Sequence, residues 1–416
     1  MHVDGDRLRT DIERTGEFGR IDAEEGWGRT VLAGSEADRR AREYLVERME
    51  AAGMTVRVDP VGNVAGRWTP ASADPDAAPV AVGSHIDSVP EGGIFDGPLG
   101  VYAGVEAVRA IRESDREPAR PVEVVSFTEE EGGRTDVGLL GSSVAAGQRS
   151  VEEAHGLTDD EGTTLREHLD RIGFVGDATV DPAEWDAWFE LHVEQGTRLE
   201  EAGVPVGVVT AITGVTNCEV RIRGETDHAG STPMDTRSDA LAAASEFVLD
   251  VEAAAREVTL TDSHSAVGTV GKIAVEPNAR NVVPGEVRMR TDFRDVEAAS
   301  MDAVVDRARK SLARLERDRG VETDLDRYRD QPPTAMSDRA RAALHAGAER
   351  AGVEAMDMHS GAAHDTINVA AGTDTALLFA PSRDGVSHTP REWTDWADCA
   401  AATRVLAEGV ADLAAE

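Results

Sequence analysis

Hydrophobic and polar positions along the chain follow two patterns, one typical of helices and one typical of buried strands. Apolar residues in 36–53 recur at the spacing of one helix face, and Gly53 ends the pattern. Short runs rich in valine and other strand-forming residues stand at 55–58, 63–68, 80–84 and 122–127. The last run is almost wholly apolar, as expected for a strand covered on both faces. This alternation predicts a layered α/β domain.

The pattern changes near Thr213. Six elements are expected in the order strand, helix, strand, strand, helix, strand, at 216–223, 238–256, 265–276, 286–293, 298–319 and 321–327. That order is typical of the ferredoxin-like α+β unit. Two prolines at 332–333 then break the chain, and helix–strand alternation resumes at 338–351 and 375–379. We therefore predict a larger α/β domain in two parts, 1–212 and 330–416, with an α+β domain inserted at 213–329.

The charge balance is extreme and changes which partners are plausible. Asp and Glu number 79 against 43 Lys and Arg, for a formal net charge of -36, and Lys272 and Lys310 are the only lysines. No basic stripe exists to neutralise phosphates, which argues against nucleic-acid binding. The acids are spread along the whole chain, which favours a halophilic surface over a docking site for a cationic partner. We expect salt to stabilise the fold, and unfolding measured across a salt titration tests this.

No targeting signal is visible in the sequence. The first residues are polar and charged, and no apolar run approaches membrane-spanning length, so no membrane partner is expected. Cys218 and Cys399 stand far apart in sequence and are expected to be reduced. These features favour a cytoplasmic protein.

Four polar clusters follow apolar runs of the larger domain. They are GSHIDSV at 83–89 with FDGPLG at 95–100, TEEEG at 128–132, ELHVEQG at 190–196 and GVSHTP at 385–390. Taken singly, each histidine fits a surface hydrogen bond and the acidic run fits a solvated loop. Together they place three histidines and two carboxylates where an open α/β sheet binds its ligands. Imidazole and carboxylate suit Zn, Mn, Co or Ni, so the sequence predicts a dinuclear metal site.

These and further ordered motifs (DHAGSTPM, EPNARNVVPG, TDFR and SGAAHD) extend over nearly the whole chain. The chain resembles the hydantoinase/carbamoylase family of metal-dependent amidases, within the dimetal aminoacylase and carboxypeptidase (M20-type) superfamily. The resemblance implies an aminopeptidase-like catalytic domain. It also implies that the insert serves as a lid and dimerisation domain, and that the protein is a homodimer.

The resemblance implies two divalent ions per subunit. Its metal ligands are matched by His85, Asp96, Glu131, His192 and His388. Asp96 would bridge the ions. One ion would be completed by His85 and His192, and the other by Glu131 and His388.

The resemblance also implies roles in catalysis and substrate binding. Glu130 matches the general base, and Glu129 is left without a role. His228 matches a histidine that reaches the substrate, in relatives from the partner subunit. The remaining implied substrate residues are Gln195, Asn278, Asn281, Arg294, Gly361 and His364. The planar fork of an arginine suits a carboxylate, although Arg294 considered alone would pass for a surface charge.

Two positions depart from the family pattern. Ala363 stands where many relatives have a second glycine, and Thr135 follows Arg134 where many have phenylalanine. Neither position is an implied ligand. Both changes are expected to alter the shape of the substrate pocket.

The main hypothesis is hydrolysis of an N-carbamoyl-L-amino acid to the amino acid, CO2 and NH3. The nucleophile would be a hydroxide bridging two metals, with Glu130 as general base and then general acid. Allantoate amidohydrolase and β-ureidopropionase stay open, because their substrates also carry a ureido group and a carboxylate. An aminoacylase or dipeptidase is less favoured, since related peptidases usually have a carboxylate where His192 stands. A non-catalytic metal-binding homologue is the alternative from a different class, and metal analysis would test it.

Overall fold

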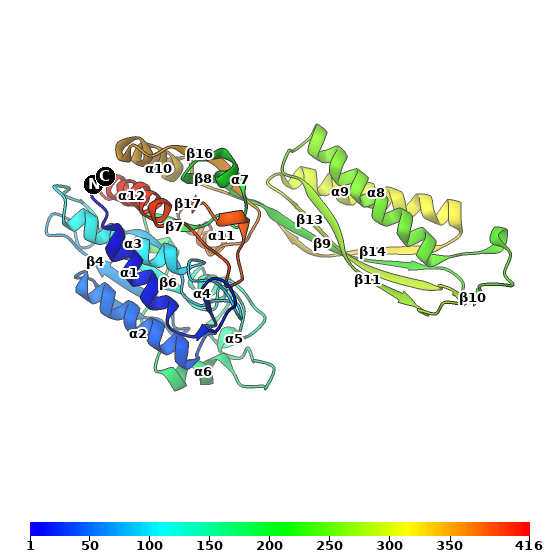
Figure 1. Ribbon diagram of the computed structural model, residues 1–416, viewed down its shortest axis with the longest axis horizontal. Coiled ribbons are helices and arrows are strands. Elements are labelled where there is room, and N and C mark those ends of the chain that lie inside the picture. The colour runs from blue at the N-terminus through cyan, green and yellow to red at the C-terminus, as the bar shows by residue number, and fades with distance from the viewer. The chain divides into compact units, whose positions relative to one another are not determined.

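The computed structural model describes residues 1–416 and divides into two compact units (Figure 1). The larger unit comprises Met1–Thr210 and Met336–Glu416, and the smaller unit is Ala211–Ala335. No helix in either unit combines the length and the apolar character needed to cross a membrane. Both cysteines are unpaired and buried.

The larger unit is built on a mixed sheet whose four central strands run parallel. In spatial order these are β17 (Asp374–Ala380), β7 (Ala187–Val193), β5 (Val80–His85) and β6 (Val122–Phe127). Beyond β6 the sheet continues with β4 (Val64–Trp68) and β3 (Thr55–Val58), and beyond β17 with β8 (Val206–Ile212) and β15 (Thr334–Ala335). β16 (Ala355–Ser360) also pairs with β8. Every residue of β5, β6 and β7 is buried, which explains their near-continuous apolar sequence.

Helices cover both faces of this sheet. One face carries the main core, shared by α1 (Gly5–Gly16), α2 (Glu36–Ala51), α3 (Pro98–Arg112), α10 (Asp338–Ala351) and α12 (Trp396–Leu413). A second cluster packs on the opposite face around Trp185 and Trp188, whose rings stack with centroids 5.3 Å apart. The shorter elements of this unit are β1 (Arg20–Ile21), β2 (Gly28–Arg29), α4 (Leu140–Ala145), α5 (Val151–His155), α6 (Leu165–Ile172), α7 (Arg198–Ala202) and α11 (Thr366–Val369). The mixed α/β class predicted from the sequence is confirmed.

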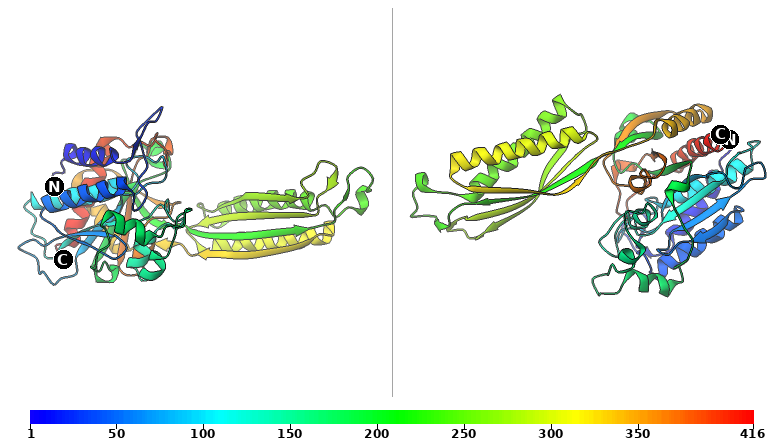
Figure 2. Two further views of the ribbon diagram at one scale, coloured as in Figure 1. Left: turned by 90° about the horizontal axis from the view of Figure 1, so that it is seen from below. Right: turned by 180° about the vertical axis from the view of Figure 1, so that it is seen from behind.

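The smaller unit has a four-stranded antiparallel sheet. Its strands lie in the order β11 (Val267–Glu276), β13 (Glu286–Asp295), β9 (Gly214–Arg223) and β14 (Glu322–Gln331). α8 (Ala240–Thr261) and α9 (Ala298–Arg319) lie on one face of this sheet (Figure 2) and share a core around Phe247. The chain order and strand order are those of a ferredoxin-like unit. A short ribbon of β10 (Asp227–His228) and β12 (Val282–Val283) stands at the end of the sheet where Arg223 pairs with Glu286.

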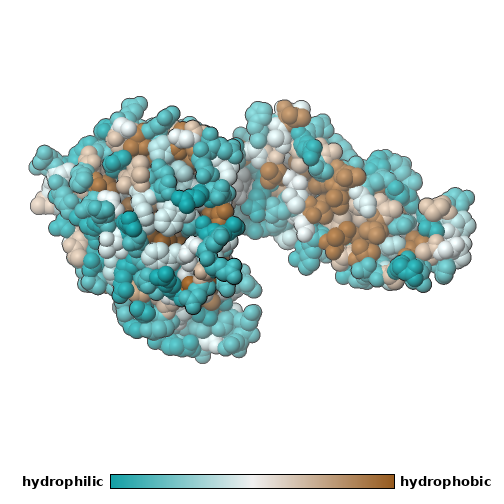
Figure 3. Space-filling model, viewed as in Figure 1, coloured by the Kyte–Doolittle hydropathy of each residue, from teal (hydrophilic) through white to brown (hydrophobic).

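The smaller unit also exposes apolar side chains. Leu249 and Leu260 on α8, and Val267 and Ile273 on β11, are all more than half exposed. Figure 3 shows apolar residues gathered over α8 and β11. Such a patch is unusual on a chain with a net charge of -36.

Candidate dinuclear metal centre

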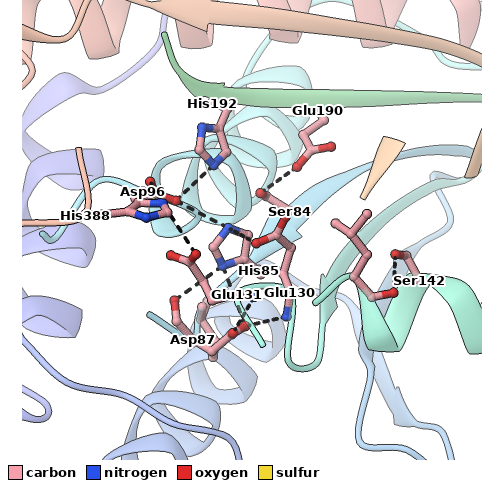
Figure 4. Close-up of polar contacts among 12 residues, drawn as sticks. Ser84, His85, Asp87, Asp96, Glu130, Glu131, Ser142, Glu190, His192 and His388 are labelled. Carbon is pink, nitrogen blue, oxygen red and sulfur yellow. Dashed lines mark hydrogen bonds and ion pairs between the residues drawn. The ribbon is translucent and has the colours of Figure 1, made fainter. Parts of the chain in front are cut away.

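The polar clusters of the larger unit meet at one edge of its sheet. β5, β6, β7 and β17 are parallel, so their carboxyl ends lie together. His85 is the last residue of β5 and His192 the penultimate residue of β7. Glu131 follows β6, and His388 lies in the loop after β17 (Figure 4). The parallel topology therefore gathers side chains that are separated by up to 303 positions in sequence.

Asp96 stands at the centre of this group. Its Oδ1 lies 3.1 Å from Nε2 of His192 and 3.5 Å from Nε2 of His85. Its Oδ2 lies 3.5 Å from Nε2 of His388, which is itself 3.4 Å from Oε2 of Glu131. Two groups of three result, one with both histidines at the strand ends and one with Glu131 and His388, and the ligand atoms of each lie within 4.8 Å of one another. Asp96 belongs to both groups.

The donor set fits divalent cations. Nε2 of His85 is buried and has no hydrogen-bond partner, as expected of a nitrogen whose lone pair is kept for a metal. Burial, followed by the charge of Asp96, raises the pKa of Glu131 to about 8. Burial acts to lower the pKa of His192, but the Asp96 carboxylate raises it to about 9. Carboxylates crowded so closely require positive charge, which bound cations would supply.

A glycine makes room for the first histidine. Gly97 has a φ of +81°, and a Cβ added there would lie 2.4 Å from Cε1 of His85. A side chain at this position would displace the imidazole from Asp96. The glycine in FDGPLG therefore contributes to the geometry of the centre.

Asp87 supports the centre from behind His85, and the sequence alone gave it no role. Its carboxylate lies 3.6 Å from Nδ1 of His85 and accepts the backbone N–H groups of Glu130 at 3.3 Å and Glu131 at 3.1 Å. It thus fixes both an imidazole and the acidic segment beside it. The signal was present in the sequence, because a carboxylate two residues after a ligand histidine is well placed to orient its ring.

The three consecutive glutamates have different environments. Oε2 of Glu130 lies 3.6 Å from Nε2 of His85, and burial raises the pKa of Glu130 well above its usual range. Glu129 is buried, and its Oε1 accepts the backbone N–H groups of Arg134 at 2.6 Å and Thr135 at 2.8 Å. Glu129, which the sequence left without a role, therefore holds the following loop together.

Comparison with known proteins identifies the family. Residues 81–412 match the model of peptidase family M20/M25/M40. An N-carbamoyl-L-amino acid amidohydrolase of Geobacillus stearothermophilus is 38% identical over 416 residues, which cover 99% of each chain. The crystal structure of an amidase of the hydantoinase/carbamoylase family from Burkholderia multivorans has a TM-score of 0.91 and 37% identity, covering 100% of this chain and 98% of that chain. The chain belongs to the hydantoinase/carbamoylase family.

Two further proteins match this chain less closely. The allantoate amidohydrolase of Bacillus subtilis is 35% identical over 349 residues, 83% of each chain. The aminopeptidase PepT of Bacillus cereus, with a TM-score of 0.67 and 17% identity, shares the fold alone. The resemblance inferred from the motifs is thus confirmed at the level of the family.

Three of the substrate residues implied by the family lie in the larger unit. Nε2 of Gln195 donates a hydrogen bond to Oδ2 of Asp96 at 2.8 Å. The ring of His364 packs edge-on against His192 with centroids 4.6 Å apart, and burial lowers its pKa well below the usual range, so it is neutral. Gly361 is exposed directly after β16. Gln195 and His364 thus contact the ligand group, whereas Gly361 lies in the loop before His364.

The family's substrate residues in the smaller unit do not form one group. His228, Asn278 and Asn281 are exposed near the β10–β12 ribbon, where the backbone N–H of Ala229 donates to the carbonyl of Asn281 at 3.0 Å. Arg294 lies near the opposite end of β13. The smaller unit therefore divides its polar residues between its two ends.

Proposed function

We propose that this protein hydrolyses the C–N bond of a small ureido compound, most simply an N-carbamoyl-L-amino acid, with two divalent ions per subunit. The observation that carries the proposal is the pair of three-residue groups that share Asp96, with the Glu130 carboxylate beside them. The match to an N-carbamoyl-L-amino acid amidohydrolase over 99% of both chains supports the substrate class.

Each group would hold one ion, and Zn, Mn, Co and Ni all suit its imidazole and carboxylate donors. When bound, such ions would polarise a carbonyl and lower the pKa of a water. Glu130 would take a proton from the attacking water as the water oxygen bonds to the carbonyl carbon, and would return that proton to the departing nitrogen. The C–N bond would then break, the nitrogen would leave as an amine or ammonia, and the remaining carbamic acid would release CO2.

The tautomer of His228 suits it to stabilise the developing oxyanion. Its Nδ1 accepts the backbone N–H groups of Gly230 and Ser231, both at 3.1 Å. A nitrogen that accepts two hydrogen bonds carries no proton, so the proton of the neutral ring resides on Nε2. This N–H on an exposed side chain could donate to a substrate oxygen in the transition state.

The distance between His228 and Arg294 within the smaller unit argues for two contributing chains. β13 begins at Glu286, next to the β10–β12 ribbon. Arg294 lies eight residues further along this strand, which corresponds to about 26 Å. A small ureido acid cannot reach both ends of such a sheet. If both side chains contact one substrate, they come from different subunits, so the site would be completed by a partner's His228.

The two edge strands of the smaller unit indicate where the partner would bind. Six of the ten residues of the edge strand β14 are charged, against two of ten in the other edge strand, β11. Charged edges resist pairing with another strand, whereas apolar edges permit it. We propose that a second copy of the chain pairs through β11 and covers the exposed leucines of α8. The smaller unit would then serve as both dimerisation domain and lid.

Ammonia release in high salt, with added manganese, zinc or cobalt, tests the function. The substrates are N-carbamoyl-L-amino acids, allantoate and 3-ureidopropionate, with an N-acetyl amino acid followed by the appearance of free amino acid. We expect release from an N-carbamoyl-L-amino acid that a chelator abolishes. Turnover of only another ureido compound would reassign the substrate, and turnover of only the acetyl compound would make the protein an aminoacylase. Absence of all turnover in a protein that binds metal would favour a non-catalytic homologue.

A further inference from the structure

A buried glutamate links two ligand-bearing loops of the candidate centre. Glu392 lies four residues after His388 and is 1% exposed. Its Oε1 accepts the backbone N–H groups of Phe95 and Asp96, both at 2.9 Å. Its Oε2 lies 3.0 Å from the hydroxyl of Ser387, the neighbour of His388. One carboxylate therefore joins segments almost 300 positions apart.

The link reaches the side chain of Asp96 as well as its backbone. The hydroxyl of Ser387 lies 2.6 Å from Oδ2 of Asp96, the oxygen that faces His388. A serine hydroxyl has one proton to donate. The shorter contact indicates that this proton is directed mainly at Asp96, and Oε2 of Glu392 shares it as a second, more distant acceptor on the other side of the serine.

The surroundings of Glu392 are adapted to this contact. A Cβ at Gly93 would lie 2.4 Å from Oε1 of Glu392, so the close approach of the 93–96 loop requires a glycine there. The buried guanidinium of Arg29 donates to the carbonyls of Gly93 at 3.0 Å and Ile86 at 3.1 Å. The Arg29 guanidinium also lies near Glu392, but burial, followed by the charge of Asp96, still raises the pKa of Glu392 to about 7.

The two groups of ligands differ in how firmly they are held. The side chains of His85 and His192 are 1% and 3% exposed, whereas that of His388 is 49% exposed. Packing can orient the rings of His85 and His192. The ring of His388 must instead be held largely by its own loop, 387–392. The link through Ser387 and Glu392 is one of two connections between that loop and the shared Asp96. The other is Gln195, whose Nε2 lies 2.8 Å from Oδ2 of Asp96, 3.3 Å from the hydroxyl of Ser387 and 3.4 Å from Nε2 of His388.

We propose that Glu392 is a positioning residue that holds Asp96 and the His388 loop in register, and thereby sets the metal affinity of the Asp96–Glu131–His388 group. This inference rests on the proposed dinuclear centre. Residues behind the ligands commonly change metal affinity by about 10–100-fold when they are removed. Glu392 acts through hydrogen bonds at both oxygens, so its role depends on acceptors and donors rather than on its charge.

Two substitutions separate hydrogen bonding from charge. Glu392→Gln keeps an oxygen for the two backbone N–H groups, and its amide can donate to the Ser387 oxygen while that hydroxyl donates to Asp96. Glu392→Ala removes every contact. Glu123→Ala is the matched control, because Glu123 is also fully buried in this unit but pairs with Arg57 instead.

The test is metal binding to the metal-free protein, measured by equilibrium dialysis against buffered Zn²⁺ or Mn²⁺ and elemental analysis. In Glu392→Ala the weaker of the two binding steps is expected to lose about 10–100-fold in affinity while the tighter step changes by less than about threefold. Glu392→Gln and Glu123→Ala should both bind like the wild type. Thermal unfolding of each metal-free variant separates a general loss of stability from a loss at the site.

Equal affinities in wild type and Glu392→Ala would overturn the inference, as would a loss in Glu392→Gln as large as in Glu392→Ala. If Glu392→Ala does not fold, Ser387→Ala removes only the hydroxyl and should weaken the same step by about 3–10-fold; no change would again overturn the inference. A wild-type protein that binds fewer than two ions would contradict the dinuclear centre itself, which is a different result from unchanged affinities in a protein that binds two.

Discussion

In the larger unit, the proposed ligand atoms lie close together before any ion or substrate is considered. His192 is buried with its Nε2 3.1 Å from Asp96. In the smaller unit, the proposed substrate residues either face solvent or have another partner. His228 is exposed, and Arg294 donates from Nε to Oδ1 of Asp292 at 2.9 Å. The larger unit therefore holds its proposed ligands in place, whereas the smaller unit does not bring its proposed substrate residues together.

The difference follows from what each set of residues binds. A dinuclear centre needs several ligands within a few ångströms, so the fold itself must hold them in position even against the repulsion between Asp96 and Glu131. Residues that bind a substrate need to be in position only when the substrate arrives, so they can stay exposed until then. The smaller unit should therefore supply groups that act only once substrate has arrived, and the larger unit a centre that is in place beforehand.

Glu130→Gln should give the largest effect, because it removes the proposed proton carrier while keeping the shape of the side chain. We expect kcat to fall by about 10²–10⁴-fold with both ions retained. Steady-state kinetics and elemental analysis of the same preparation provide the measurement. Activity near that of the wild type would refute the assignment.

The neighbouring residue offers the control. Glu131→Gln should lose one ion per subunit, because Oε2 of Glu131 belongs to the second group of ligands. Glu130 would then be required for turnover and Glu131 for metal binding, although the two residues are adjacent in sequence. Equal metal loss in both variants would contradict the division of roles.

The ligands proposed from the sequence come together in the larger unit, because each motif follows a strand and parallel strands bring their carboxyl ends together. It did not predict α1 or α12. The latter is buried nearly all round, so its alanine-rich sequence lacks the alternating polar face on which the helix prediction depends. The contacts of Asp87 and Glu392 were missed because they support ligands instead of matching a ligand motif. The distance between His228 and Arg294 along the smaller unit could not be predicted from the sequence, because it depends on how the strands pair.

Complementation tests whether the smaller unit acts in a partner's site. His228→Ala alone should lower kcat by about 10²–10³-fold, by loss of an oxyanion donor. Coexpressed with Glu130→Gln, it forms mixed dimers in which one site has both an intact Glu130 and a partner's His228. If subunits pair at random, the mixture should regain about a quarter of wild-type activity.

Mixed dimers purified through two different tags sharpen the measurement. Such dimers should show about half of wild-type activity, because one of their two sites is complete. Activity no higher than that of either parent would mean that His228 serves its own subunit or no site at all. That result would leave the metal centre untouched and would remove the reason for two contributing chains.

The two edge strands provide a matched pair of positions for testing the proposed dimer. Ile273 on β11 and Tyr328 on β14 are both 51% exposed. Ile273→Lys should shift the protein to monomers in light scattering and lower activity by roughly tenfold or more at nanomolar concentration, since a charge on an edge strand blocks pairing. Tyr328→Lys should change neither. A dimer that survives the first change would place the interface elsewhere.

Arg294→Lys should have the smallest effect and the one most confined to binding. Lysine keeps the positive charge but loses the two parallel N–H donors that fit a carboxylate, so we expect KM to rise by about 10-fold with kcat within about threefold. Because Arg294 is paired with Asp292 in the structure, a substrate carboxylate must compete for it, and the net gain from the fork is limited. A fall in kcat as large as that of His228→Ala would contradict the proposed binding role, because it would mean that Arg294 acts in the chemical step.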